Sequence, residues 1–200
     1  MGMESWEEKE LGQVVKNHDS KRIPFSQTQR ENMDKIYDYY GASGVIDKVD
    51  NFIFDKPLLL IGEDGANLVT RSKPIAFIAT GKYWVNNHAH VLEATEYTLL
   101  EYICYFINYI DLNPYITGSA QPKMTQEKMN IIPVPLPSLP EQQEIVRILD
   151  CLFEKEQRTC ELCGIIEKID LMKKAILARA FRGELGTNDP REESAEGVVK

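Results

Sequence analysis

The sequence predicts an α+β protein, in which a globular domain of mixed strands and helices (residues 1–137) precedes one long helix (residues 138–183). In the first region, short apolar runs alternate with glycine and proline, as is typical of strands and helices joined by tight turns. In the second region, apolar residues recur at helical spacing over the whole length. The polar residues 184–200 are expected to form a loosely held tail.

Composition favours a cytoplasmic globular protein. Of the 200 residues, 43% are hydrophobic and 27% are charged, which fits one core domain with an additional element. No apolar run approaches the ~18 residues that a membrane span needs. The acidic start MGMESWEEKELGQ does not resemble a signal peptide, so we expect the four cysteines to be reduced thiols.

The uneven distribution of charge along the chain is compatible with an anionic partner. The net charge of −8, taken alone, argues against nucleic acid, whose binding depends on neutralising phosphates. However, residues 65–92 and 112–126 contain no Asp or Glu, and both windows carry basic side chains. We therefore expect an acidic protein with one basic face.

Short elements follow one another through the globular region. Residues 57–69 (PLLLIGEDGANLV) predict a buried strand of about five residues and a glycine-containing turn. Strands are also predicted within LGQVV (11–15), GASGVID (41–47), PIAFIAT (74–80) and YWVNNHAHVLEA (83–94), and a helix or turn within TQRENMDKIYDYY (28–40). The two histidines at 88 and 90 are expected to face the same side of a strand, since side chains alternate along it.

The region ends in a helix and a proline-rich segment. Residues 95–110 have a broad apolar face at helical spacing, and Thr95 is a suitable cap. TQEKM (125–129) predicts one polar helical turn. Residues 131–137 (IIPVPLP) cannot form a central strand, because three prolines remove backbone donors, so we expect an edge segment or an extended strut.

The last helix begins with a capping box formed by Ser138 and Glu141, and the pattern ends near Phe181. About 40 residues at 1.5 Å each give a helix of roughly 60 Å. An apolar stripe on a helix of this length requires a partner helix. The predicted partner-facing residues are Ile145, Leu149, Leu152, Cys160, Cys163, Ile166, Ile169, Ile176 and Leu177.

No catalytic residue or metal site is predicted. Asn113-Pro114-Tyr115 partly matches a base-gripping methyltransferase motif, but a helix-ending turn explains it, and no glycine-rich loop is present for S-adenosylmethionine. Cys160 and Cys163 have the spacing of a zinc pair, but a second pair is missing, so packing explains them better. If two copies of the helix paired antiparallel, these thiols would meet near the helix midpoint. A metal site or a disulfide shared by two copies is therefore an alternative to simple packing.

Two polar segments have the side chains of a DNA interface. Asn can pair with adenine, Lys and Arg with guanine or phosphate, and aromatic rings with thymine methyl groups. Any polar surface loop offers similar residue types, so the pattern alone does not decide the matter. The candidates are Arg71, Lys73, Lys82, Tyr83, Trp84, Asn86, Asn87, His88, Thr117, Ser119, Gln121 and Lys123.

The stretch IIPVPLPSLPEQQEIVRILD (131–150) resembles the specificity subunits of type I restriction–modification systems. SWEEKELGQVV, YYGASGVID, LLLIGEDGAN, NNHAHVL, TGSAQPKMT and ILARAFRGEL agree with the same family in the same order. The resemblance covers nearly the whole chain. The chain is similar to a half-length form of the family, with one target recognition domain (1–137) and one helical spacer and dimerisation region (138–183).

This resemblance implies a non-catalytic, sequence-specific DNA-binding subunit. A full-length member has two recognition domains, so this chain is expected to form a homodimer through an antiparallel coiled coil and to read a split inverted repeat in double-stranded DNA. The implied partners are methyltransferase and restriction subunits, with no membrane. S-adenosylmethionine, ATP and magnesium would be used by those other subunits and not by this chain. The alternative is a silent or partner-dependent recognition cassette that acts only as an interaction module.

Overall fold

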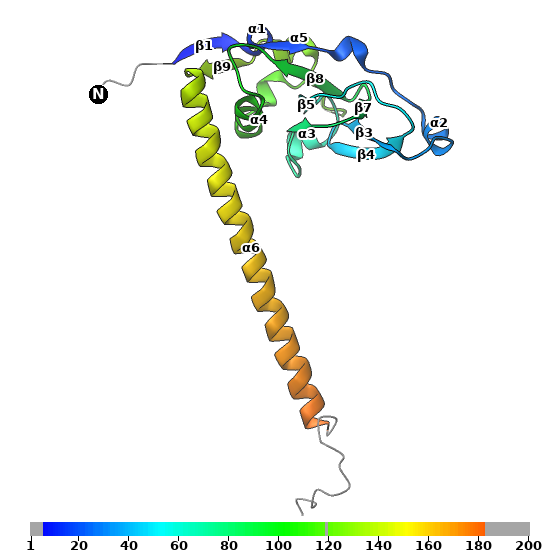
Figure 1. Cartoon of the computed structure of the whole chain (residues 1–200), viewed down its shortest axis with the longest axis vertical. Helices are drawn as coiled ribbons and strands as arrows, with labels where there is room; N and C mark the ends of the chain where they lie inside the picture. Colours follow the sequence, from blue (N-terminus) through cyan, green and yellow to red (C-terminus); the bar gives the residue numbers. More distant parts are fainter. Residues whose placement is uncertain (1–5, 119, 183–200) are drawn as a thin grey trace, which may run out of the picture. The chain divides into compact units, whose positions relative to one another are not determined.

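The computed structural model describes residues 6–118 and 120–182, so the predicted tail lies outside the described part of the chain. The chain divides into a first unit, Met1–Ile148, and a second unit, Leu149–Lys200. The strands and short helices that Figure 1 shows belong to the first unit, and the second unit continues the long helix α6. This mixed α/β unit followed by a long helix confirms the predicted fold class.

The described strands of the first unit form three sheets. A four-stranded antiparallel sheet has the order β2-β8-β5-β6, and a three-stranded mixed sheet has the order β4-β3-β7. Strands β1 and β9 form a separate antiparallel pair. The strands are β1 (Glu7–Glu10), β2 (Val15–Asn17), β3 (Tyr37–Gly41), β4 (Gly44–Val49), β5 (Leu58–Gly62), β6 (Ala76–Ala79), β7 (Tyr83–Val85), β8 (Ala89–Ala94) and β9 (Pro133–Leu136).

Most helices of the first unit are short. The exceptions are α4, which packs against β5 and β6, and α6, which begins in this unit. The helices are α1 (Leu11–Val14), α2 (Gln27–Glu31), α3 (Asn67–Thr70), α4 (Leu100–Tyr109), α5 (Gln126–Asn130) and α6 (Leu139–Phe181), with 3₁₀ turns at Asp19–Lys21 and Asn113–Tyr115.

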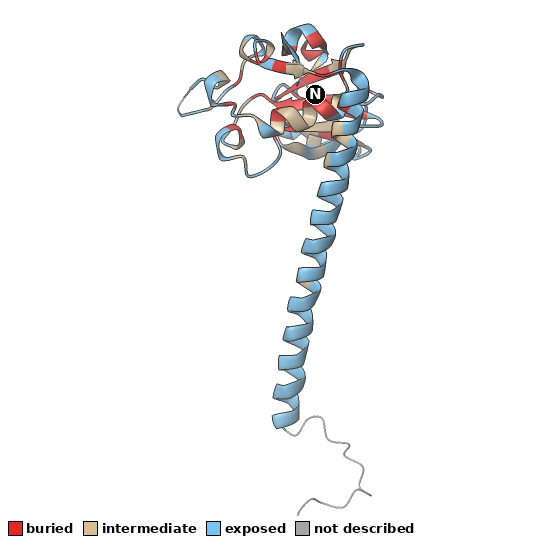
Figure 2. Cartoon of the chain, turned by 90° about the vertical axis from the view of Figure 1, so that its left-hand side faces the viewer, coloured by how far each residue is buried: buried red, intermediate tan, exposed pale blue. Residues whose placement is uncertain are grey.

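Strand β5 lies at the centre of the core, as its apolar run predicts. Leu59 and Ile61 belong to the cluster that includes α4, whereas Leu58 and Leu60 belong to a second cluster on the other face of the sheet. Side chains alternate along a strand, so a strand covered on both faces has apolar residues at every position. Figure 2 shows these buried strands inside the first unit.

The proline-rich segment forms the predicted edge strand. Strand β9 pairs only with β1 among the described strands, and Lys9 lies opposite Val134. Prolines at 133 and 135 leave the backbone without two donors, which a strand with a single neighbour tolerates. Met129 in α5 and Ile132 directly before β9 are fully buried and anchor the segment to the core.

Two local predictions were wrong. Residues 11–14 form the helical turn α1 before the short strand β2, because buried Leu11 and Val14 sit one helical turn apart. Thr95 does not cap α4, which begins at Leu100; its hydroxyl instead donates to the carbonyl of Val14 at 2.7 Å. The predictions of a helical turn at α5 and of a long helix ending near Phe181 are confirmed.

The part of α6 that belongs to the second unit, from Leu149 onward, is exposed at nearly every residue, as the pale blue ribbon in Figure 2 shows. Its exposed apolar residues include Leu152, Leu162 and Ile166, which are 55%, 61% and 60% accessible. Within the described residues, every helix is too short or too polar to traverse a bilayer.

Candidate nucleic-acid interface

Three loops from distant parts of the sequence meet in the four-stranded sheet beside the C-terminal end of β5 and the N-terminal end of β8. They are residues 63–66 after β5, residues 86–88 between β7 and β8, and the hairpin of residues 117–123. The backbone N–H of Glu63 donates to His88 at 2.8 Å, and that of Gly65 donates to Pro122 at 3.0 Å. These bonds fix the three loops as one surface, which we call the loop cluster.

The 117–123 hairpin is closed by its own backbone. Thr117 and Lys123 exchange two hydrogen bonds of 2.8 Å between their N–H and carbonyl groups. Gly118 has a φ of +81°, and a Cβ at this position would lie 2.6 Å from the carbonyl oxygen of Gln121. The turn therefore requires glycine. Thr117, Gln121 and Lys123 are exposed, while Ser119 lies outside the described residues.

A network of ion pairs links the hairpin to Glu63 and Arg22. Glu63 is 8% exposed and accepts from Arg22 Nη1 at 2.6 Å, and its second oxygen lies 2.9 Å from Lys123 Nζ. Burial raises the pKa of Glu63, but the hydrogen bonds from Arg22 and Lys123 outweigh it and hold that pKa below its usual value. Glu63 thus stays ionised beneath the loop cluster.

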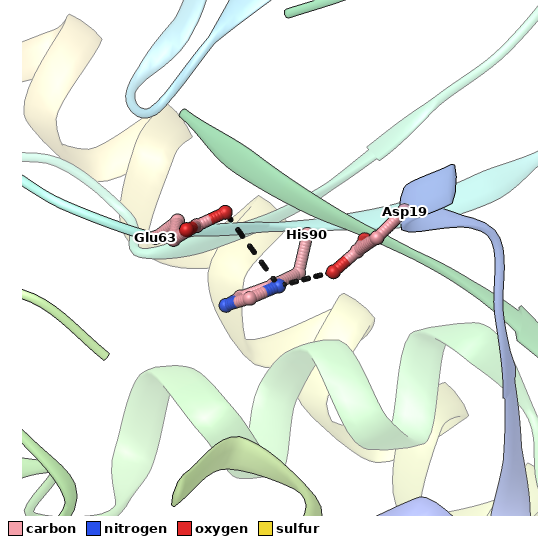
Figure 3. Close-up of side chains that lie close together, drawn as sticks. All are labelled: Asp19, Glu63 and His90. Atoms are coloured by element: carbon pink, nitrogen blue, oxygen red, sulfur yellow. Dashed lines mark hydrogen bonds and ion pairs between the residues drawn. The ribbon is translucent and has the colours of Figure 1, made fainter. Parts of the chain in front are cut away.

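Asp19, Glu63 and His90 come together in the same network, and Figure 3 shows their side chains converging from the 3₁₀ turn, the end of β5 and β8. Their potential ligand atoms lie within 4.8 Å of one another, which is the geometry of a possible metal site. Whether these groups could bind a cation depends on the partners that they already have.

Existing partners already satisfy the three groups. His90 Nδ1 lies 2.6 Å from Asp19 Oδ2 and Nε2 lies 2.9 Å from the carbonyl of Met124, so both ring nitrogens face acceptors. Arg22 Nη2 also lies 3.3 Å from Asp19 Oδ2, in addition to its bond with Glu63. A guanidinium thus supplies the positive charge between the carboxylates, and the arrangement is a structural ion network rather than an open ligand set.

Asp64 and His88 form a second pair on the surface of the loop cluster. His88 Nδ1 lies 2.9 Å from Asp64 Oδ1 and 2.8 Å from Oδ2. The pair lines a hollow of about 370 Å³. The other lining residues are Gly41, Ala42, Ser43, Ile46, Gly65, Ala66, Asn67 and Asn86.

The structure corrects the prediction for Tyr83 and Trp84. Tyr83 is fully buried and its hydroxyl donates to the carbonyl of Lys56 at 2.9 Å. Trp84 is 7% exposed and its indole N–H donates to Ile23 at 2.6 Å. Both aromatic side chains pack in the core, so neither offers a face to DNA. A short strand that is buried at every position can have the same sequence pattern as an aromatic binding loop.

Of the remaining predicted DNA-binding residues, some lie in the loop cluster and others lie outside it. Asn87, His88, Thr117, Gln121 and Lys123 are exposed in the loop cluster, where Asn86 is buried and its side-chain oxygen accepts from the N–H of His88 at 2.8 Å. Contrary to expectation, His88 and His90 are in different environments, because β8 begins only at Ala89.

Arg71, Lys73 and Lys82 lie outside the loop cluster. Arg71 donates to the carbonyls of Ile110 at 2.5 Å and Ile107 at 3.1 Å, and so caps the C-terminal end of α4. Lys82 lies over the ring of Phe52, with 4.6 Å between Nζ and the ring centroid. Lys73 is exposed. A DNA contact for these three residues stays a prediction.

Glu63 and Asp64 were not among the predicted site residues. One available signal was their position directly after the buried run of residues 58–62, where a strand end presents side chains to the surface.

The predicted partner-facing residues of α6 also divide. Ile145 is partly buried and packs against the core of the first unit. Leu149 is intermediate in exposure. The others are exposed: Leu152, Cys160, Cys163, Ile166, Ile169, Ile176 and Leu177.

Comparison with known proteins places this arrangement among restriction systems. The family model for the type I restriction modification DNA specificity domain matches residues 3–163. Over 115 residues the chain is 36% identical to a type I restriction enzyme specificity subunit of Haemophilus influenzae, covering 57% of this chain and 29% of that protein. Over 65 residues it is 42% identical to the EcoDI specificity subunit of Escherichia coli, covering 32% of this chain and 15% of that protein.

Solved structures show the same fold at low sequence identity. The type I S subunit from M. genitalium superposes with a TM-score of 0.62 at 14% identity, covering 84% of this chain and 44% of that protein. The HsdS subunit from Thermoanaerobacter tengcongensis gives a TM-score of 0.56 at 20% identity, covering 92% of this chain and 47% of that protein. The chain therefore spans about half the length of these two proteins.

Proposed function

Because the chain belongs to the family of type I restriction–modification DNA specificity domains, we propose that its first unit reads one part of a divided DNA sequence. The observation that carries this proposal is the loop cluster, in which distant segments present polar side chains on one fixed surface. We further propose that helix α6 pairs with the α6 helix of a second copy.

The exposed side chains of the loop cluster suit DNA. Lys123 can neutralise a phosphate, whereas Asn87, Gln121 and Thr117 can exchange hydrogen bonds with base edges or the backbone. Backbone bonds and the Glu63 network hold these groups in place before binding, which reduces the entropy lost when DNA is bound.

The net charge of −8 indicates weak DNA binding by this chain alone, because phosphate contacts dominate affinity. We propose that methyltransferase subunits bind this chain and supply much of the affinity, and that a restriction subunit joins the complex. In this assembly the chain contributes no catalysis. The other subunits use S-adenosylmethionine, ATP and magnesium, and the complex acts on DNA in the cytoplasm.

The exposed apolar residues of α6 support pairing of two copies. Leu152, Leu162, Ile166, Ile169 and Ile176 recur at spacings of three, four, seven or ten residues, which places them along one side of the helix. A second, antiparallel copy would cover this stripe with an equivalent one. Such a homodimer carries two identical readers and would recognise an inverted repeat with unread bases between its halves.

The test is to express the chain with a methyltransferase subunit of its family in a host without DNA modification, and then to map methylated bases. A split inverted-repeat motif that appears only with this chain is the expected result. A split but asymmetric motif would overturn the homodimer and indicate pairing with a different reader. Absence of methylation, with both proteins folded and associated, would overturn the reading function and favour a silent cassette.

A further inference from the structure

The Asp64–His88 pair fixes the position of one proton. Both carboxylate oxygens of Asp64 lie within 2.9 Å of His88 Nδ1. An ionised carboxylate only accepts hydrogen bonds, so Nδ1 must carry the hydrogen. In the singly protonated ring, Nε2 is then left with a lone pair and acts as an acceptor.

The acceptor nitrogen is available to a ligand. No described residue forms a hydrogen bond with His88 Nε2, and the His88 side chain is 48% exposed. The ring is also held through its backbone, because its N–H donates to Asn86 Oδ1 and its carbonyl accepts from Glu63, each at 2.8 Å. His88 is therefore a fixed, half-exposed acceptor at the rim of the hollow.

The charges around His88 favour a hydrogen-bond donor over a phosphate. Asp64 faces the ring from the β5–α3 loop. The described polar side chains that line the hollow are Ser43, Asp64, Asn67, Asn86 and His88. A phosphate in contact with His88 would also meet the Asp64 carboxylate, which repels it.

We propose that His88, oriented by Asp64, accepts a hydrogen bond from the exocyclic amino group of an adenine or cytosine in the major groove. These amino groups are the base-edge donors of the major groove. The pair is then a specificity determinant within the loop cluster, and this role rests on the proposed function of that surface. Asp64 is a positioning residue, because it acts through the ring of His88.

The first experiment removes single amino groups from the DNA. The probes are copies of the mapped target duplex in which each adenine is replaced in turn by purine and each cytosine by 2-pyrimidinone, which lack the amino group. We expect the complex of this chain with its methyltransferase to lose about threefold to tenfold in affinity at one position of each half-site. The His88→Ala complex should bind more weakly and show no further loss at that same position.

The second experiment uses a conservative variant as a readout that a purely structural role would not change. The His88→Gln complex should bind the target duplex more tightly than the His88→Ala complex, because a glutamine oxygen can accept the hydrogen bond in place of Nε2. Asp64→Asn should retain the orienting hydrogen bond and bind better than Asp64→Ala.

Several results would overturn the inference. Equal losses at every amino group with and without His88 would show that the ring reads none of them. Equal affinities of the His88→Gln and His88→Ala complexes would show that no acceptor is needed at this position. If the unaltered complex binds its target specifically while His88→Ala binds equally well, only this inference fails. If the unaltered complex shows no specific binding, the proposed function fails with it.

Discussion

The side-chain oxygen of Gln142, on the first turn of α6, accepts a hydrogen bond from the backbone N–H of Leu99 at 3.0 Å. The amide nitrogen of Gln142 donates to the carbonyls of Tyr97 at 2.9 Å and Pro137 at 3.0 Å. Gln142 is fully buried. One side chain therefore satisfies three backbone groups and links the start of α6 to the segment that precedes α4.

Replacement of Gln142 by Ala is expected to lower the free energy of unfolding by about 2–3 kcal/mol, because it leaves buried backbone groups without partners. Chemical denaturation measures this loss. The adjacent Gln143 is exposed, so Gln143→Ala should change stability by less than about 0.5 kcal/mol. Equal effects for the two variants would contradict the proposed role of the buried amide.

Glu93 should make stability depend on pH. Hydrogen bonds from Lys56 and His18 lower the pKa of Glu93 to about 2. Because this folded-state pKa lies below the ordinary value of about 4.3, the ionised carboxylate stabilises the fold above about pH 4.3. That contribution is lost as the pH falls toward about pH 2.

Glu93→Gln is therefore expected to cost about 1 kcal/mol near pH 7, a modest value because the side chain is 30% exposed and solvent screens the charges. The difference from the unaltered protein should shrink as the pH approaches the lowered pKa. Denaturation at a series of pH values measures it. Glu96→Gln is the control, since Glu96 is exposed and has no described ion-pair partner; a constant difference for Glu93→Gln would rule out the linkage.

A charge in the apolar stripe of α6 should separate the proposed homodimer. Ile166 is 60% exposed in the single chain, and pairing would bury it against the second helix. Ile166→Asp is expected to yield a monomer in light scattering, because burial of an unpaired carboxylate is unfavourable. Lys168→Asp changes a residue on the other side of the helix and should leave the dimer intact. A dimer that survives Ile166→Asp would refute this assignment of the stripe.

Lys123 is expected to contribute a phosphate contact from the loop cluster. Lys123→Ala should weaken binding similarly for different DNA sequences and reduce the slope of log affinity against log salt by about one. Lys16 is a matched control, because it lies opposite Glu93, toward the end of β8 away from His88. Titrations at several salt concentrations distinguish the two. Identical salt slopes for both variants would remove Lys123 from the interface.

Local pattern predicted much of the fold. The apolar run of residues 58–62 became the buried strand β5, and the helical spacing after residue 95 became α4. Prolines at 133 and 135 predicted an edge segment, which is β9. In each case the deciding interaction lies within the segment itself: its hydrogen-bond capacity, its turn residues, or the face that its side chains bury.

Exposure was harder to predict than secondary structure. The polar loop residues Asn87 and His88 are on the surface as expected, whereas the neighbouring Tyr83 and Trp84 are in the core. Tyr83 and Trp84 have both an apolar ring and a polar atom, so their types suit either location. Which one they occupy depends on whether a carbonyl from another segment, here Lys56 or Ile23, lies within reach.

Local patterns in the chain were therefore sufficient to predict the α+β architecture, the long helix and two segments of the loop cluster. The pairing of Glu63 with Arg22, 41 residues away, and of Asp64 with His88, 24 residues away, became apparent only in the folded protein. The periodicity of a segment reports which face is buried, because that depends on near neighbours in the chain. The partner of a charged side chain depends on which distant segments the sheet brings to the same edge, and no local pattern contains that information.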